Sequence, residues 1–171
     1  HFHPEYELNF IYRGKGVRRI VGDHSDEIDD LELVLVGPNV VHGWELHNCT
    51  CKEIYEITIH IHNDLLDKKM LSRRLFKPIS DMFNRAKFGI LFSRETTNLM
   101  MPRLMLLSRI TGLQYYLEFI SILNELAISE GQKSLSVLSD EREDFHNSDK
   151  IKKVYDFIQE NFSKTITLDE I

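Results

Sequence analysis

Short runs of the β type fill the first third of the chain. Apolar residues alternate with polar ones, or form brief apolar runs, over residues 7–12, 17–21, 31–36 and 53–62. Turn-forming residues separate these runs, as at Arg13-Gly14-Lys15-Gly16, where glycine can supply the positive φ of a hairpin turn. Because no helical period lies between the runs, the pattern predicts an antiparallel barrel or meander rather than a parallel α/β sheet. The acidic residues 22–30 are expected to form a loop.

The spacing of apolar residues changes to three and four after residue 62. This period predicts two short helices within residues 64–88, divided at Pro78. A brief extended piece is expected at residues 89–92, before the pattern becomes helical again.

Two longer helices are predicted over residues 95–110 and 113–129, and Gly112 between them would let them form a hairpin. The second is apolar around most of its circumference, so it must be buried on two sides. One side can pack within the chain and the other is a candidate interface of a homodimer, although both sides could instead be buried in one molecule. The candidate interface residues are Leu113, Tyr116, Leu117, Ile120 and Leu123.

The tail of the chain has a different composition. Residues 131–147 are rich in Ser, Asp and Glu and are expected to form a linker. Residues 148–171 then carry a helix with one apolar face, followed by a capping box at 167–170 that begins another helix. We expect the partners of that apolar face to lie beyond Ile171.

The predicted fold class is therefore α+β, in the order of an antiparallel β-barrel, a helical hairpin and a separate C-terminal helix. The expected domains are a barrel over residues 1–63, a helical region over 64–130, the linker over 131–147 and a second unit over 148–171.

The composition indicates a soluble globular protein, with 42% hydrophobic and 28% charged residues. No run approaches the roughly 18 apolar residues that span a bilayer, so a cytoplasmic location without a membrane partner is expected. The net charge of −6 argues against extensive phosphate contacts by these residues themselves. Cys49 and Cys51 are expected to be reduced thiols.

Residues of metal-ligand type gather at two places in the β region. His1, His3 and Glu7 are two and four positions apart, so on an extended chain they share one face. His42 follows a turn-forming sequence in which Asn39 is suited to a left-handed φ. These three imidazoles and one carboxylate suit a divalent metal such as Zn, Ni, Mn or Fe, but they could also bind an effector directly or form a self-satisfied polar interior.

Alternation extends this candidate site. Asn9 continues the face of Glu7, and Trp44 continues the face of His42 with a ring that can stack on a sugar. His60 and His62 could line the same cavity, although a solvated strand face is the commoner cause of their pattern. The candidate effector-binding residues are His1, His3, Glu7, Asn9, His42 and Trp44.

These residues resemble the motifs of the cupin superfamily. His1, His3, Glu7 and Gly14 match the spacing of the first cupin motif without a gap. The second motif is matched in part, since His42 fits whereas Gly37 and Asn39 stand where proline and glycine are usual. The resemblance implies a cupin-type barrel, which is a double-stranded β-helix, with a candidate divalent metal site.

The order of cupin motifs, helical hairpin, linker and the segment 150–171 is similar to that of AraC-type (arabinose-regulator) transcription regulators. In that family the last segment opens a DNA-binding domain with two helix-turn-helix units. The resemblance implies a bacterial ligand-sensing and dimerisation region without catalytic activity, which binds a small effector, often a sugar, and contacts DNA only through a further C-terminal domain. The alternatives are a metal-dependent cupin enzyme, such as a dioxygenase or sugar isomerase, and a free-standing sugar-binding cupin.

Overall fold

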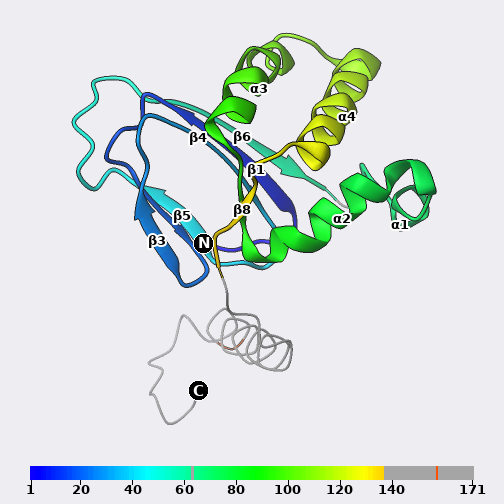
Figure 1. The fold of residues 1–171 in the computed structure, drawn as a ribbon, viewed down its shortest axis with the longest axis horizontal. Coiled ribbons are helices and arrows are strands. Elements are labelled where there is room, and N and C mark those ends of the chain that lie inside the picture. Colours follow the sequence, from blue (N-terminus) through cyan, green and yellow to red (C-terminus); the bar gives the residue numbers. More distant parts are fainter. Residues whose placement is uncertain (63, 137–156, 158–171) are drawn as a thin grey trace. The chain divides into compact units, whose positions relative to one another are not determined.

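The computed structural model describes residues 1–62, 64–136 and 157 (Figure 1). The chain divides into two compact units, residues 1–137 and 138–171. The described part of the first unit is of mixed α+β class, with antiparallel sheets and several helices, so the predicted class is confirmed. Of the C-terminal helix expected within residues 148–171, only Phe157 lies inside the described residues, and it is helical.

The larger of two sheets has the strand order β6-β1-β4-β7-β8, and all its neighbouring strands are antiparallel. The smaller sheet has the order β3-β2-β5 and is also antiparallel. The larger sheet consists of β1 (Tyr6–Tyr12), β4 (Leu31–Val36), β6 (Tyr55–Ile61), β7 (Ile90–Leu91) and β8 (Lys133–Ser134). The smaller sheet consists of β2 (Arg18–Val21), β3 (His24–Glu27) and β5 (His42–Glu45).

The four predicted strands correspond to β1, β2, β4 and β6 within two residues at each end. The loop expected at residues 22–30 is wrong, because β3 lies within it and pairs with β2. The chain passes from one sheet to the other between β1 and β2 and again at each link from β3 to β6. The described strands form two sheets whose ladders do not close into a barrel, so the predicted closed barrel is not confirmed.

Strands β1 and β4 are buried on both faces. Leu8 and Phe10 of β1 and Leu33 and Leu35 of β4 join the main hydrophobic core together with the helices. The alternate positions, such as Glu7, face the smaller sheet, since successive side chains of a strand point to opposite faces. Figure 1 shows the helices gathered on one side of the larger sheet and the smaller sheet on the other.

The helices follow β6 and β7 in the chain. Pro78 lies in the first turn of a helix instead of dividing two helices as predicted, because its fixed φ suits that position. Among the described residues, no helix has both the length and the apolar character that crossing a membrane requires. The α-helices are α1 (Lys68–Leu71), α2 (Lys77–Arg85), α3 (Arg94–Leu107) and α4 (Gly112–Ile128), with 3-10 turns at Arg74–Phe76 and Ala86–Phe88.

Helix α4 packs against both α2 and α3, so the predicted hairpin also closes the core over the sheet. Arg103 of α3 fixes this packing by donating to Glu118 at 2.6 Å and to Ser121 at 2.8 Å. Leu123 is fully buried in the core, which corrects its place among the candidate interface residues: its side chain cannot reach a second molecule.

The linker predicted over residues 131–147 does not begin at residue 131. Lys133 and Ser134 form β8, which extends the larger sheet beside β7. Leu135 is buried in a small apolar cluster, and the Ser136 hydroxyl donates to Asp23 Oδ1 at 2.5 Å. The larger sheet therefore includes β7 and β8, which lie outside residues 1–63, the range predicted for the barrel domain.

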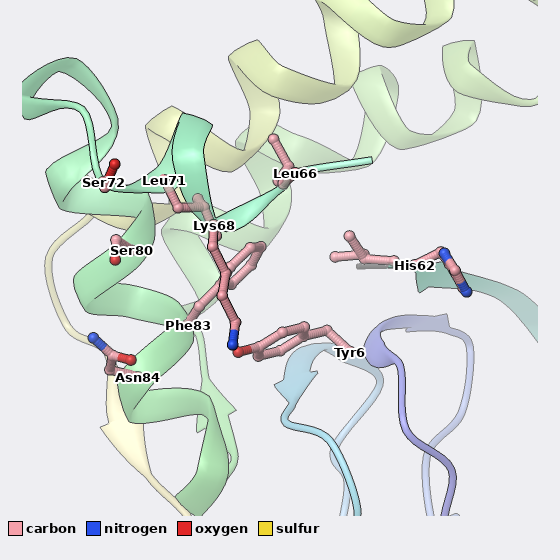
Figure 2. A pocket seen from close by; sticks show the side chains of 10 residues that line it. Tyr6, His62, Leu66, Lys68, Leu71, Ser72, Ser80, Phe83 and Asn84 are labelled. Atoms are coloured by element: carbon pink, nitrogen blue, oxygen red, sulfur yellow. The ribbon is translucent and has the colours of Figure 1, made fainter. Parts of the chain in front are cut away.

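Helices α1 and α2 and the ends of β1 and β6 surround a cavity of about 450 Å³ (Figure 2). A second cavity, of about 280 Å³, lies on the other face of the β1–β6 pair, where Glu7 and His60 line it. We call the larger one the helical cavity and the smaller one the sheet cavity.

An ion pair joins the two sheets in the interior. Arg19 of β2 pairs with Glu32 of β4, and both side chains are buried. Trp44 Nε1 donates to the same carboxylate at 3.2 Å. The preceding residue, Arg18, lies at the surface and pairs with Glu45, because successive side chains of a strand point to opposite faces.

The substitution Arg19→Met is expected to lower the free energy of unfolding by about 3–5 kcal/mol, because it leaves the Glu32 carboxylate buried without a cation. The double variant Arg19→Met/Glu32→Gln should recover most of that loss, since glutamine removes the charge and still accepts from Trp44. Urea denaturation of both variants and the wild type measures the difference. A double variant as unstable as the single one would show that packing, and not the unpaired charge, causes the loss.

Candidate functional site

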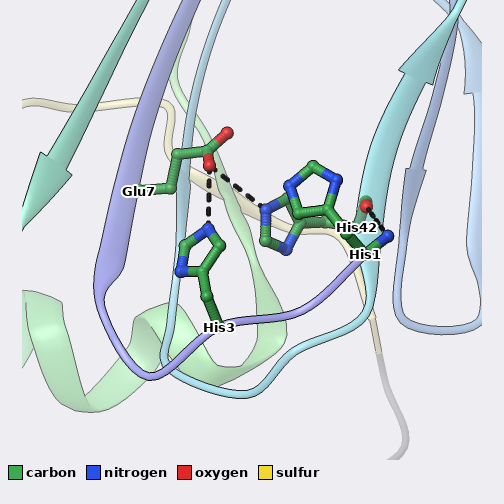
Figure 3. A group of neighbouring side chains, drawn as sticks. All are labelled: His1, His3, Glu7 and His42. Carbon is green, nitrogen blue, oxygen red and sulfur yellow. Dashed lines mark hydrogen bonds and ion pairs between the residues drawn. The ribbon is translucent and has the colours of Figure 1, made fainter.

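Glu7 and three histidines converge at one end of the space between the sheets (Figure 3). Glu7 lies on β1, where it stands opposite Val36 of β4 and His60 of β6. His42 begins β5 on the smaller sheet. His1 and His3 come from the segment before β1, so three separate parts of the chain build the cluster.

Backbone hydrogen bonds hold the N-terminal segment beside the β4–β5 turn. The backbone nitrogen of His1 donates to the His42 carbonyl at 3.1 Å, and the His42 amide donates to the His1 carbonyl at 2.9 Å. The Asn39 amide donates to the His3 carbonyl at 2.8 Å. His1 and His3 therefore reach the site across a bend, and not along the continuous extended chain that was expected to place them on the face of Glu7.

The β4–β5 turn explains two departures from the cupin motif. Asn39 has a φ of 59°, the left-handed conformation expected from the sequence. The Gly37 amide donates to the Ala86 carbonyl at 2.8 Å, and a Cβ at position 37 would lie only 2.9 Å from that carbonyl oxygen. A proline at this position would lack the amide hydrogen and would clash, so glycine is required.

The Glu7 carboxylate is the centre of the cluster. Its Oε2 atom lies 3.0 Å from His3 Nε2, 3.2 Å from His42 Nε2 and 3.5 Å from His60 Nε2. Burial of the carboxyl raises its pKa, but hydrogen bonds with His42 and His3 outweigh that effect, so the pKa of Glu7 is lowered. Glu7 is therefore a buried carboxylate held in its charged form by imidazoles.

The contact between His42 and Glu7 needs a positive charge. His42 Nδ1 lies 2.7 Å from the Val40 carbonyl oxygen, which can only accept, so Nδ1 carries a proton. In a neutral imidazole Nε2 then has a lone pair, and this lone pair would face Glu7 Oε2. The repulsion between Nε2 and Oε2 is removed either by protonation of Nε2 or by a cation that both atoms bind. A histidine whose Nδ1 hydrogen is held by a backbone carbonyl has the tautomer that ligates metals through Nε2.

The donor set fits a divalent metal. The ligand atoms of His1, His3, Glu7 and His42 all lie within 4.8 Å of one another. An ion bonded at about 2.1 Å separates its ligand atoms by about 3–4 Å, so small side-chain rotations would bring the four groups to a suitable spacing. His3, Glu5 and His60 form a second group with the same spread, in which His3 Nδ1 lies 3.4 Å from Glu5 Oε2.

The sheet cavity opens beside this cluster. It takes residues from β1, β5, β6 and the N-terminal segment, so both sheets contribute to its wall. Its volume of about 280 Å³ is just below the usual range for small-molecule pockets, which is about 300–1,000 Å³. Its lining residues are His1, Glu7, Asn9, Gly43, Trp44, Glu45, Glu56, Thr58 and His60.

Asn9 and Trp44 are held in place by their polar atoms. Asn9 Nδ2 donates to Glu56 Oε1 at 2.8 Å and to Thr58 Oγ1 at 3.1 Å. This leaves the buried Asn9 Oδ1 without a hydrogen-bond partner. The Trp44 ring is half-buried, packs against apolar clusters on both sides, and has its Nε1 hydrogen engaged by Glu32.

The structure brings most of the predicted effector residues together. His1, Glu7, Asn9 and Trp44 line the sheet cavity, whereas His3 and His42 stand behind Glu7 and contact its carboxylate. Strand β6 adds Glu56, Thr58 and His60 to the lining, and all three are exposed, so the solvated strand face expected from the sequence is also the open side of the sheet cavity. Their alternation was visible, but only the pairing of β6 with β1 identifies their face as the face of Glu7 and Asn9.

Comparison with known proteins adds no relative. The chain matches no protein-family model, no curated protein and no solved structure. Its function must therefore be argued from the residues of the site.

Replacing Glu7 by glutamine should expose the role of the carboxylate charge. Because the pKa of Glu7 is lowered in the folded chain, its charge stabilises the fold above the ordinary pKa, and this stabilisation is lost as the pH falls through the lowered value. We expect Glu7→Gln to lower the free energy of unfolding by about 2 kcal/mol at neutral pH and by progressively less below about pH 4. Urea denaturation with a chelator present measures both values.

The exposed Glu53→Gln is the matched control and should change stability little at any pH. A loss in Glu7→Gln that is the same at neutral and acidic pH would contradict a role for the charge.

Proposed function

We propose that this chain is the ligand-sensing and dimerisation region of a bacterial AraC-type transcription regulator, and that it binds a small polyhydroxyl effector, such as a sugar, in a cupin-like cavity. The observation that carries the proposal is the sheet cavity, where a buried carboxylate, imidazoles, an unpaired amide oxygen and an indole ring meet. The passage of the chain from sheet to sheet agrees with the cupin-type fold that the motifs imply.

The lining of the sheet cavity suits a neutral ligand rich in hydroxyl groups. Glu7 and Glu56 are acceptors, which a sugar's hydroxyl hydrogens can satisfy. Trp44 offers part of its ring as an apolar surface against which a sugar ring can pack. A cavity with this many carboxylates repels an anionic effector.

A divalent metal would be held by His1, His3, Glu7 and His42. When bound, such an ion would act as a Lewis acid that binds and polarises an oxygen atom of the effector. Asn9 and Glu56 would then orient the rest of the molecule through hydrogen bonds. In this proposal the site binds and does not catalyse, and an effector acts by favouring one arrangement of the regulator over another.

Exposed apolar residues on α4 support a homodimer through the helical hairpin. Leu113 is 71% exposed and Leu117 is 59% exposed, although both lie on an otherwise well-packed helix. Leu106 of α3 is also exposed. Tyr116 and Ile120 are half-buried and border this surface. Binding of DNA would then require residues beyond Ile171, as in the regulators that the chain resembles.

A metal-dependent cupin enzyme is the second candidate. The observation that favours it is the convergence of three imidazoles and a carboxylate at an open cavity, which is also the ligand set of a catalytic metal. The linker and the apolar helix that the sequence predicts beyond residue 136 favour the regulator, because a small enzyme has no evident use for them. Reading the gene beyond codon 171 distinguishes the two, since the regulator requires two helix-turn-helix patterns there.

A thermal-shift screen against sugars, with and without divalent metals, tests the proposed effector. At a concentration about 100 times its dissociation constant, a bound sugar should raise the melting temperature by roughly 5–10 °C. The shift should be lost in Asn9→Ala and in Glu56→Ala, the second of which alters an exposed side chain and should fold normally. His62→Ala, an exposed histidine outside the sheet cavity, should keep it. Stoichiometric metal without any response to sugars would favour the enzyme instead.

The substitutions Leu113→Glu and Leu117→Glu together should weaken a homodimer by at least about tenfold, because they place charges on its apolar surface. Light scattering at matched concentrations would report the mass of the chain for the variant and twice that mass for the wild type. Leu75→Glu is the matched control, since Leu75 is equally exposed but lies outside the hairpin. A soluble double variant that keeps the dimer mass would exclude this interface.

A further inference from the structure

The helical cavity takes no part in the function proposed above. It is the larger of the two cavities, at about 450 Å³, and its size is typical of small-molecule pockets. Tyr6 and Ile61, which stand opposite each other on β1 and β6, form one wall. Helices α1 and α2 provide the other walls (Figure 2).

One wall of the helical cavity is apolar. Ile61, Leu66 and Phe83 are buried core residues that also line the cavity. The ring of Tyr6 stacks on Phe83, with the ring centres 4.4 Å apart and the planes 20° apart. Burial raises the pKa of Tyr6, so its hydroxyl stays protonated and can donate a hydrogen bond. This wall would accept an aliphatic or aromatic group without rearrangement.

The rim of the helical cavity carries polar groups that the protein itself leaves unused. Figure 2 shows the Lys68 side chain extending along the cavity toward the ring of Tyr6. Within the described residues Lys68 forms no ion pair, and the side chains of Ser80 and Asn84 form no hydrogen bond. The imidazole of His62 points away from the other lining residues in the same view.

The surroundings of the rim are positively charged in a chain with a net charge of −6. Lys68, Lys69, Arg73 and Arg74 lie close together in sequence, and none of them pairs with a carboxylate in the described part of the chain. The nearby acidic residues are engaged elsewhere, and among them Asp81 pairs with Lys77. Asp67 caps α1 by accepting from the Met70 amide at 2.6 Å, and Asp64 lies 3.3 Å from His62.

We infer that the helical cavity binds a small organic anion with an apolar or aromatic body. The acidic head, a carboxylate, sulfonate or phosphate ester, pairs with Lys68 and accepts hydrogen bonds from Ser80, Asn84 or Tyr6. The body lies on Phe83 and Leu66. Its chemistry is opposite to that of the ligand proposed for the sheet cavity, so the two sites select different molecules.

Fluorescence titration of the 171-residue chain with anilinonaphthalene sulfonate tests this inference, because the dye is an aromatic sulfonate that brightens in apolar sites. We expect saturable binding that octanoate displaces and that octanol displaces only at concentrations at least about tenfold higher. Lys68→Gln should weaken dye binding by about tenfold through loss of a charge-assisted hydrogen bond. The matched control Lys69→Gln removes the same charge from the next residue and should change binding by less than about twofold. Circular dichroism checks that each variant is folded.

Several results would overturn the inference. Equal losses in Lys68→Gln and Lys69→Gln would indicate general attraction to the basic surface, and equal displacement by octanol and octanoate would indicate an apolar cavity without anion recognition. Absence of saturable binding to the wild type would also exclude the site. Asn9→Ala lies in the sheet cavity and should bind the dye normally. Dye binding that is lost in Asn9→Ala but kept in Lys68→Gln would assign the anion to the sheet cavity and would contradict this inference. That result would leave the proposed binding of a sugar to be judged by the thermal-shift screen alone.

Discussion

Burial of β1 and β4 on both faces is the constraint on which the rest of the structure depends. Their alternate residues meet two different environments, the helical core on one side and the space between the sheets on the other. Leu8 and Phe10 pack in the helical core, whereas Glu7 and Asn9 are buried in the space between the sheets. A buried polar group costs free energy unless it is paired. The interior between the sheets is therefore arranged around partners: imidazoles for Glu7, β6 side chains for Asn9, and Arg19 with Trp44 for Glu32.

This polar interior is not fully satisfied, and the position of the unpaired atoms matters. The buried Asn9 Oδ1 belongs to a residue that lines the sheet cavity. A purely structural network gains most when every buried atom is paired, so Asn9 Oδ1 is the point at which the network beside the sheet cavity is incomplete. Arg19 Nε is also unpaired, but its guanidinium already pairs with Glu32 in the interior, where it contributes to the join between the sheets.

The sequence predicts those parts of the fold that have a strong apolar signal. Strand β4 is predicted to the residue because its apolar run ends at Gly37 and Pro38, whereas β3 is missed because its acidic residues are stabilised by backbone pairing with β2. The site was predicted around Glu7 because its motif is local in sequence. His60 could be named from the sequence only as an alternative and Lys68 not at all, since their places in the cavity walls depend on which strand or helix packs beside them, and that is set by contacts between distant residues. For the same reason the burial of Leu123 was not predicted, because contacts with other elements decide that it faces the core and not the outer surface of α4.

The two cavities lie on opposite faces of the same pair of strands. Tyr6 and Ile61 line the helical cavity, while their immediate neighbours Glu7 and His60 line the sheet cavity. A ligand that moves this strand pair from one side changes the geometry offered on the other, because the side chains share adjacent peptide units. Coupling of this kind needs no long pathway, but it does require that each ligand bind one position of the strands better than the other. Because the two linings have opposite chemistry, the ligands proposed for them would not replace each other, and any coupling would combine two separate chemical signals.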